Sequence, residues 1–505
     1  MNHQDETVTQ PTPLGIRYSV RLLLLIILLG MALRCFHLGT QSLWHDEAFS
    51  LGVASRLDPG QILANQAHDV HPPLYNLLLY FWIKLVGIHD FTTRMLSLVA
   101  GVLSIPLIYV VGRKLFDPLT GLWAAFFVAV FPFHVYYSQE ARMYTLLALL
   151  TTLSLWLLLW IIERNRWWAW GCLWLCLVLG VYTHYFFAFV ILVFHLYLVL
   201  SGRKYCHLWL PLLIVDGLLV LALLPQATIF LHEFGEVVDS SYWLDRPNPL
   251  SFFTAIYFFI VSYTVPTWLN APGLFIVIGI LAVGLYEQLR LGRLDAYAGQ
   301  RRLLNMGAFL PILLVLAISQ FKPIFLERTL TICTPFLTLF LAERVCASRW
   351  HSPVTYLSMA LGVLIVISLY RFYFDSSTRK PPMREAAQYV DAHFVPGDMV
   401  LHTSVGSFLP FLFYQPPAEH YLLWAEPNAR KPAETYELFG GKLGSRATMA
   451  GHRRVWLVVA LDHAIEFQQD EVSWFDKHFS LVENADVGGI YVRLYDCGGT
   501  CTLIE

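Results

Sequence analysis

The stretch RYSVRLLLLIILLGMALRCF, residues 17–36, is an apolar run long enough to cross a lipid bilayer. It is followed at 42–51 by SLWHDEAFSL, which places Asp46 and Glu47 side by side shortly after the run ends. The whole chain has the same character, since 57% of its 505 residues are hydrophobic and only 14% are charged. Soluble globular domains carry about 25% charged residues. We therefore predict a polytopic membrane protein.

Similar apolar runs recur through the first three quarters of the chain. We predict about eleven spans, at 17–36, 95–112, 119–137, 143–162, 167–182, 184–201, 207–225, 272–289, 304–320, 329–346 and 353–371. The first run is too long for a signal-peptide core and lacks a clear cleavage site, so we expect it to be retained. Two further runs, 72–88 and 250–268, carry interfacial residues and are predicted to be in-plane or half-inserted helices, with a short span as the alternative for each.

The positions of Lys and Arg set the predicted orientation. Basic residues gather in alternate connections between spans, which the positive-inside rule assigns to the cytoplasm. These residues are Arg113, Lys114, Arg164, Arg166, Arg203, Lys204, Arg290, Arg293, Arg301, Arg302, Arg344 and Arg349. The loop 37–94, the connection 226–271 and the tail from 372 then lie outside. We expect a multi-pass protein of the plasma (inner) membrane.

The tail changes to a soluble α/β pattern. We predict a transmembrane domain over 1–371 and an extracytoplasmic domain over 372–505, joined by the linker STRKPP at 377–382. The expected elements are helices at 383–394 and 464–479 and strands at 398–403, 454–461 and 489–496. Cys497 and Cys501 form a disulfide if the compartment is oxidising, or stay as two thiols.

Most ionisable residues outside the cytoplasmic loops fall on the outer side of this topology. A transporter is expected to keep ionisable groups deep along a path, yet the predicted spans contain one deep carboxylate, Asp216. This distribution favours a reaction at the outer surface over translocation. The sequence has no phosphate-cradling glycine loop and no basic surface for nucleic acid.

An ordered set of motifs accompanies the outer residues. They are WHDEAFSL (44–51), HDVHPPLYNLLLYFWIKLVG (68–87), TTRMLS (92–97), YYSQEARMYTLL (136–147), GVYTHYF (180–186) and KPIFLERTLTICTPF (322–336). In this order they resemble the GT-C glycosyltransferases of the protein O-mannosyltransferase and aminoarabinose-transferase type, family 39. The resemblance implies an all-α GT-C membrane fold. It also implies inverting transfer of a monosaccharide from a polyprenyl-phosphate donor to a hydroxyl or amine at the outer face.

The resemblance assigns the carboxylates. Asp46 matches the family's general base, with Glu47 beside it to orient it or to hold a cation, and Glu140 matches a second acid. Asp46 could instead cap the first helix of its loop, because Asp is a common N-cap. Glu140 and Arg142 could instead pair with charges of a neighbouring loop.

The departing phosphate needs positive charge around it. Where aminoarabinose transferases carry Lys before the prolines, this chain has His71, which is only partly charged near neutral pH. Arg94, Arg142 and Arg328 are the candidates for the fixed positive charge, although Arg328 could be an interfacial residue near lipid headgroups. Metal dependence is unknown: a divalent metal is allowed, but His45, Asp46, Glu47 and His68 have no recognisable ligand spacing.

The function predicted from these residues is a membrane glycosyltransferase that contacts membrane lipids and uses a polyprenyl-phosphate-linked sugar. The alternative is a lipid or sugar transporter without transfer chemistry, and a third hypothesis is an inert envelope scaffold. The sequence identifies neither the sugar nor the acceptor, which is a lipid, a glycan or a protein.

The orientation can be checked by labelling. Cysteines placed at position 115 or 204 are expected to resist a membrane-impermeant reagent added from outside, whereas cysteines in the tail from 372 should react. Strong external labelling at 115 or 204 would contradict the predicted topology.

Overall fold

The structure is a computed structural model that describes residues 13–66, 68–239, 244–291, 296–348, 352–414, 418–423, 433–460 and 465–498. The chain forms two compact units. The first comprises Met1–Phe36, Ser97–Gln139 and Met143–Phe374. The second comprises His37–Leu96, Glu140–Arg142 and Asp375–Glu505.

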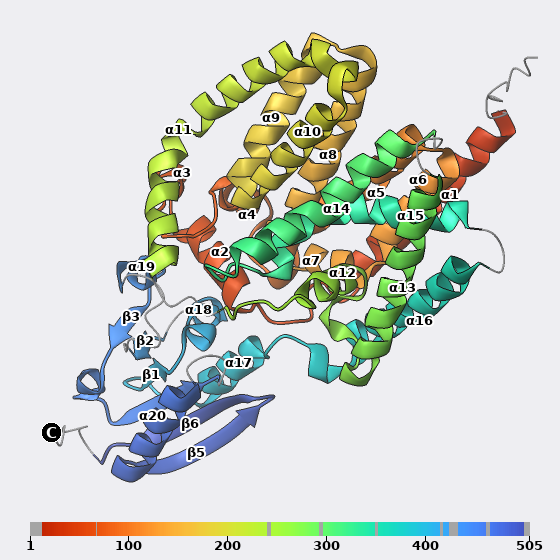
Figure 1. Ribbon diagram of the computed structural model, residues 1–505. Coiled ribbons are helices and arrows are strands. Elements are labelled where there is room, and N and C mark those ends of the chain that lie inside the picture. The colour runs from red at the N-terminus through yellow and green to blue at the C-terminus, as the bar shows by residue number, and fades with distance from the viewer. Residues whose placement is uncertain are drawn as a thin grey trace, which may run out of the picture. The chain divides into compact units, whose positions relative to one another are not determined.

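The first unit is helical (Figure 1). Its helices are α1 (Pro13–Cys35), α5 (Asp90–Leu115, whose first turns belong to the second unit), α6 (Pro118–Val130), α7 (Pro132–Ser138), α8 (Tyr144–Arg164), α9 (Trp167–Thr183), α10 (Ala188–Leu200), α11 (Trp209–Asp239), α12 (Ser251–Val261), α13 (Thr267–Leu291), α14 (Ala298–Ile318), α15 (Thr334–Ala347) and α16 (Pro353–Phe374). Within the described residues, eight helices are long and apolar enough to cross a membrane, and α6 with α7, bent by 56°, makes a ninth.

Each of the eleven predicted spans coincides with a helix or with such a helix pair. Two of them, Trp167–Thr183 and Tyr185–Leu200, are shorter apolar helices. The runs predicted to lie in the interface form α4 (Leu74–Val86, 13 residues) and α12 (11 residues). At 1.5 Å per residue, each is roughly 20 Å long or less, too short to cross a hydrocarbon core of about 30 Å. The in-plane placement of these two helices stays a prediction.

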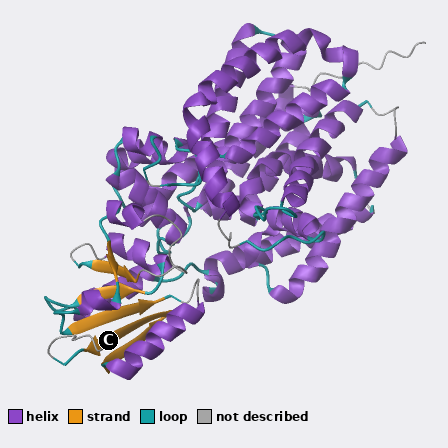
Figure 2. Cartoon of the chain, turned by 60° about the vertical axis from the view of Figure 1, so that its left-hand side comes forward, coloured by secondary structure: helices purple, strands orange, loops and turns teal. Residues whose placement is uncertain are grey.

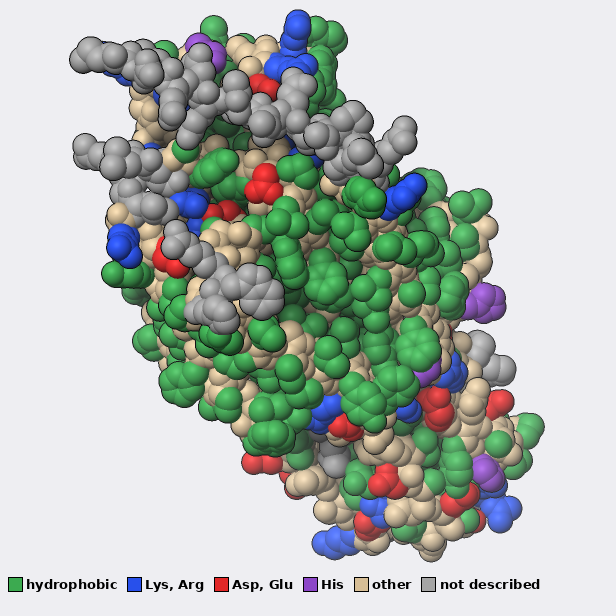
Figure 3. Space-filling view, turned by 90° about the vertical axis from the view of Figure 1, so that its right-hand side faces the viewer, with side chains coloured by type: hydrophobic (Ala, Val, Ile, Leu, Met, Phe, Trp, Pro, Cys, Tyr) green, Lys and Arg blue, Asp and Glu red, His purple; other side chains and the backbone are tan. Residues whose placement is uncertain are grey.

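Apolar side chains cover the outside of these helices. On the face that carries α16, Figure 3 shows a broad hydrophobic surface. Met359, Val363 and Val366 of α16 are each at least 60% exposed. Such a surface is unusual on a soluble protein and suits contact with lipid. The polytopic, mostly helical membrane fold is therefore confirmed.

Local sequence sets where these helices begin and how closely they pack. Asp117 caps α6 by accepting hydrogen bonds from the N–H groups of Leu119 and Thr120, and Pro118 fits the first helical position. Gly121 lets α6 approach α5, because a Cβ there would lie 2.6 Å from the carbonyl oxygen of Tyr109. Small residues permit this kind of close helix contact in membranes.

The second unit contains a six-stranded sheet with the order β3-β2-β1-β4-β6-β5. The strands are β1 (Met399–His402), β2 (His420–Leu423), β3 (Lys442–Gly444), β4 (Arg454–Val459), β5 (Ser480–Val487) and β6 (Ile490–Asp496). The first four pair in parallel, whereas β6 pairs antiparallel with β4 and β5. Figure 2 shows these strands as one sheet with helices on it.

Alternating side chains of the strands build two core layers. Val400, Trp456 and Val458 pack with residues of α17 (Met383–His393), whereas their neighbours Met399 and Leu401 pack with Phe475 of α20 (Ile465–His478). The predicted helices at 383–394 and 464–479 and strands at 398–403, 454–461 and 489–496 are confirmed. The strands β2, β3 and β5 and the helix α18 (Val405–Tyr414) were missed. Cys501 lies outside the described residues, so its pairing with Cys497 stays a prediction.

The second unit also joins the outer loop to the tail. Phe49 and Val53 of α2 (His45–Arg56) share a core with Phe408 and Leu409 of α18 and with Phe439. The loop that carries Asp46 is thus packed on the tail over a common apolar core. The predicted division into domains 1–371 and 372–505 stays a prediction.

Candidate active site

Helix α2 gives the two adjacent carboxylates different surroundings. The helix begins at His45, with Trp44 at the N-cap position, so Asp46 lies in the first turn and is not the cap. Adjacent residues of a helix do not share a face. Glu47 is fully buried, whereas the Asp46 side chain is 17% exposed, with its Oδ1 3.1 Å from Nδ1 of His45. Asp46 is therefore the more accessible of the two.

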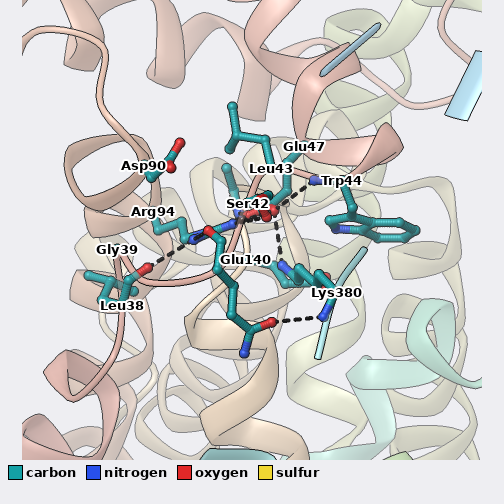
Figure 4. Close-up of polar contacts among 12 residues, drawn as sticks. Leu38, Gly39, Ser42, Leu43, Trp44, Glu47, Asp90, Arg94, Glu140 and Lys380 are labelled. Carbon is teal, nitrogen blue, oxygen red and sulfur yellow. Dashed lines mark hydrogen bonds and ion pairs between the residues drawn. The ribbon is translucent and has the colours of Figure 1, made fainter. Parts of the chain in front are cut away.

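Glu47 is surrounded by donors (Figure 4). Its carboxylate accepts from Nε and Nη2 of Arg94 at 2.7 and 2.8 Å, from Nζ of Lys380 at 2.9 Å and from the N–H of Ala141 at 2.9 Å. Burial alone would raise the pKa of Glu47, but the charges of Arg94 and Lys380 and these hydrogen bonds lower it to about 2. Glu47 is therefore ionised and saturated with hydrogen bonds.

Arg94, near the start of α5, uses all five of its side-chain N–H groups. Besides Glu47, it donates to the carbonyl oxygens of Leu38 at 2.9 Å, Gln41 at 2.8 Å and Ser42 at 2.9 Å. One side chain thus fixes both Glu47 and the loop that leads into α2. A donor phosphate would have to replace one of these acceptors, so the predicted phosphate contact of Arg94 stays a prediction.

The segment Glu140–Arg142 meets the start of α2. Glu140 is 1% exposed, and its Oε1 lies 3.3 Å from Nζ of Lys380. Arg142 donates through Nη1 to Oγ of Ser50 at 2.7 Å and to the carbonyl oxygen of Asp46 at 3.4 Å. The motifs SQEARMY and WHDEAFSL, about 90 residues apart, therefore form one polar site. The pairing of Glu140 with a charge from another segment, weighed as the structural alternative, is present.

His71 is held by a carboxylate of its own loop. Its Nδ1 lies 3.0 Å from Oδ1 of Asp69, and Asp69 Oδ2 accepts from Nδ2 of Asn76 on α4 at 3.0 Å. Nη2 of Arg142 lies 3.4 Å from the same His71 nitrogen. Burial lowers the pKa of His71, although Asp69 opposes this shift, so the ring is mostly neutral at pH 7.

Six of the seven predicted site residues therefore lie in one unit and close to one another. We call them, together with Asp69 and Lys380, the outer-loop cluster; its members are Asp46, Glu47, Asp69, His71, Arg94, Glu140, Arg142 and Lys380. Arg328 belongs to the other unit, in η5 (Glu327–Cys333), and its role stays a prediction. Sequence reasoning missed Lys380, because a lone Lys in a proline-bounded linker carries no periodic or motif signal.

Metal ligation has no support from side-chain geometry in the part of the chain that the structure describes. There, no three His, Cys, Asp or Glu residues are grouped so that they could hold an ion. His45 and Asp46 supply two neighbouring groups at most. Metal dependence stays open.

Comparisons with known proteins agree with this architecture. Residues 70–228 match the family model of dolichyl-phosphate-mannose-protein mannosyltransferases. A search of the curated proteins found no match. ArnT from Cupriavidus metallidurans in the apo state has a TM-score of 0.63 at 12% identity, over 95% of this chain and 98% of that chain.

Two further structures share the fold. The same ArnT bound to undecaprenyl phosphate has a TM-score of 0.56 at 12% identity, over 95% of this chain and 97% of that one. The oligosaccharyltransferase AglB from Archaeoglobus fulgidus, with an inhibitory peptide and a dolichol-phosphate, has a TM-score of 0.51 at 10% identity, over 95% and 74%. The chain therefore shares its fold with these solved proteins, and residues 70–228 are similar to the mannosyltransferase family.

The burial of Glu47 leads to a stability prediction. Glu47→Gln is expected to destabilise the protein by about 3–5 kcal/mol, because it leaves Arg94 and Lys380 as buried cations without their carboxylate. Thermal unfolding in detergent measures the effect, with Asp46→Asn as the matched neighbour that should unfold near the wild-type temperature. Equal unfolding temperatures for the two variants would contradict the assignment of Glu47 as the central anion.

The pH dependence has a defined sign. Because the folded pKa of Glu47 is lowered to about 2, its contribution to stability is present above the unfolded value near ~4.3 and is lost as the pH falls toward 2. Glu47→Gln should lack this part of the acid-induced loss.

Proposed function

We propose that this protein transfers a monosaccharide, with inversion, from a polyprenyl-phosphate donor to an acceptor at the outer face of the plasma (inner) membrane. The observation that carries the proposal is the outer-loop cluster. It sets an accessible carboxylate, Asp46, beside a saturated one, Glu47, and Nη1 of Arg142 lies 3.4 Å from the backbone carbonyl oxygen of Asp46. Support comes from the fold, which is shared with a protein crystallised with undecaprenyl phosphate.

Asp46 is the proposed general base. The acceptor oxygen or nitrogen attacks the anomeric carbon while its proton passes to the Asp46 carboxylate. The bond between the anomeric carbon and the phosphate oxygen breaks, and its electron pair leaves with the polyprenyl phosphate. Attack from the side opposite the phosphate inverts the configuration at that carbon.

Glu47 cannot readily take that proton, since its oxygens already accept from Arg94, Lys380 and Ala141. Its proposed part is to fix the first turn of α2 and so to orient Asp46. Adjacent carboxylates with different environments are a recurrent way to separate a reacting acid from a supporting one. Glu140 is proposed as the second acid of the site.

The leaving phosphate is proposed to meet Arg142, with His71 as a further ligand. With Nδ1–H donated to Asp69, neutral His71 presents Nε2 as an acceptor, so binding a phosphate oxygen requires the imidazolium form. Arg142 keeps its charge at any working pH and is the stronger candidate. The acceptor class, whether lipid, glycan or protein, and the sugar are set by contacts that these residues do not define.

A turnover assay tests the proposal against the transporter alternative. Purified protein is supplied with undecaprenyl-phosphate hexoses or pentoses and with lipid, glycan or peptide acceptors. Release of free undecaprenyl phosphate, measured by mass spectrometry, supports transfer. Exchange of intact donor across vesicles without release would support the transporter and overturn the proposal.

The base assignment predicts a specific loss. Asp46→Asn keeps shape and hydrogen bonding but removes basicity, so turnover should fall by ~10²–10⁴-fold. Asp58→Asn is the matched control: Asp58 is an exposed N-cap in the same loop, and Asn serves equally well as a cap. Near-normal turnover in Asp46→Asn would end the assignment. A collapse confined to Glu140→Gln would move the base to that residue.

The His71 assignment predicts rescue by a cation. His71→Lys should retain turnover and extend it to higher pH, because the wild-type ring loses its charge as the pH rises through its lowered pKa. His71→Ala should reduce turnover, and His89→Ala, at an exposed His of the same loop, should not. An inactive His71→Lys beside an active His71→Ala would exclude His71 from phosphate binding.

A further inference from the structure

Lys380 reaches the outer-loop cluster from a segment with no predicted chemistry. It follows α16 and stands in the linker before α17, yet its side chain is only 10% exposed. Nζ lies 2.9 Å from Oε2 of Glu47, 3.3 Å from Oε1 of Glu140 and 6.0 Å from the ring centre of Trp44. The ammonium group therefore bridges two buried carboxylates from different parts of the chain (Figure 4).

Neighbouring contacts hold the linker in this position. The backbone N–H of Lys380 donates to Oε1 of Gln41 at 3.1 Å. Arg384 donates to Asp90 at 2.5 Å and to the carbonyl oxygen of Thr40 at 2.7 Å. The start of the tail is thus tied by its backbone and side chains to the loop that leads into α2. These contacts hold the backbone that carries Lys380 next to that loop.

Charge explains why a cation is needed there. Arg94 contacts Glu47, but the structure places its other donors on backbone carbonyl oxygens of the loop. Without Lys380, the buried carboxylates Glu47 and Glu140 would lose the ammonium group that contacts both, and uncompensated negative charge away from water is strongly unfavourable. Lys380 balances the pair and gives Glu140 a defined partner.

We propose that Lys380 is a positioning residue of the transfer site, which holds Glu140 against Glu47 and makes the start of the tail part of that site. The inference rests on the proposed function, since it assigns Lys380 to the same reaction. It differs from a purely structural ion pair in one respect. Removing the charge should change how the reaction depends on pH, as well as how stably the protein folds.

The experiment compares Lys380→Met, Lys380→Arg and the control Lys442→Met. Lys442 forms an exposed pair with Glu419 in the same unit, so its loss tests the general effect of removing a Lys. Turnover is measured against pH and donor concentration, with the donor found active for the wild type. Binding of undecaprenyl phosphate and thermal unfolding are measured alongside.

Lys380→Met is expected to lower kcat by about 10- to 100-fold, with little change in the donor KM. Losses of this size are common when a residue that supports a reaction centre is removed. The acidic limb of its pH profile should move to higher pH, because removing this positive charge favours protonation of the carboxylates of the site. Lys380→Arg should recover most of kcat and the wild-type limb, and Lys442→Met should match the wild type.

A double variant separates positioning from general destabilisation. If Lys380 acts by holding Glu140, Lys380→Met with Glu140→Gln should lose no more turnover than Glu140→Gln alone. The same double variant removes one charge of each sign, so it replaces Lys380→Met if that variant fails to fold. Additive losses in the double variant would overturn the positioning role.

The remaining outcomes separate the two proposals. Wild-type turnover together with an unchanged kcat and pH profile in Lys380→Met would overturn the role of Lys380 and leave the proposed function intact. No turnover by the wild type with any donor and acceptor would overturn the proposed function, and the role of Lys380 with it.

Discussion

The buried ion pair between Glu47 and Arg94 is the interaction on which the outer-loop cluster depends. Glu47 is completely buried, and Arg94 is 1% exposed. Such a pair contributes little net stability by comparison with apolar packing, but the loss of either partner leaves an uncompensated buried charge. The pair instead determines which segments come together. Arg94 donates hydrogen bonds to the backbone from Leu38 to Ser42, and Glu47 accepts hydrogen bonds from Ala141 and Lys380. Four segments distant in sequence are thereby held next to one another.

This arrangement explains why two acidic residues stand side by side in WHDEAFSL. On a helix their side chains diverge, so one turns into the protein and the other remains accessible. The hydrogen bonds of Glu47 go to Arg94, Ala141 and Lys380, and they hold the first turn of α2 in place. Asp46 lies in the same turn, so its backbone is held in place as well. A reacting group must be held close to its productive geometry. The adjacent pair is thus one supporting and one reacting group.

The sequence predicted the parts of the structure that depend on local pattern. Long apolar runs fix the helices of the first unit, since few other structures can satisfy the backbone in lipid. The buried strands β1 and β4 were visible as short apolar runs. By contrast β5, with the sequence SLVENADV, is largely exposed and offered no apolar pattern, and β2 and β3 have four and three residues. Asp46, Glu47 and Glu140 were predicted as site residues from motifs. The burial of Glu47 but not of Asp46, and the position of Lys380 beside Glu47, depend on tertiary contacts that a short stretch of sequence does not contain.

Acidic and basic side chains are unevenly matched in the outer-loop cluster. Within the outer-loop cluster, the carboxylates of Asp46, Glu47, Asp69 and Glu140 face the cations of Arg94, Arg142 and Lys380, and the lowered pKa of His71 leaves its ring mostly neutral at pH 7. If all four carboxylates are counted as ionised, they exceed the three cations by one before a donor binds. A sugar phosphodiester brings a further negative charge, and its departure as a phosphate monoester increases that charge again. Developing negative charge in a site of this kind has to be met by preorganised positive groups. Such a site favours one further positive group at the phosphate, for which a protonated His71 and a divalent metal are candidates with distinct dependence on pH and chelators.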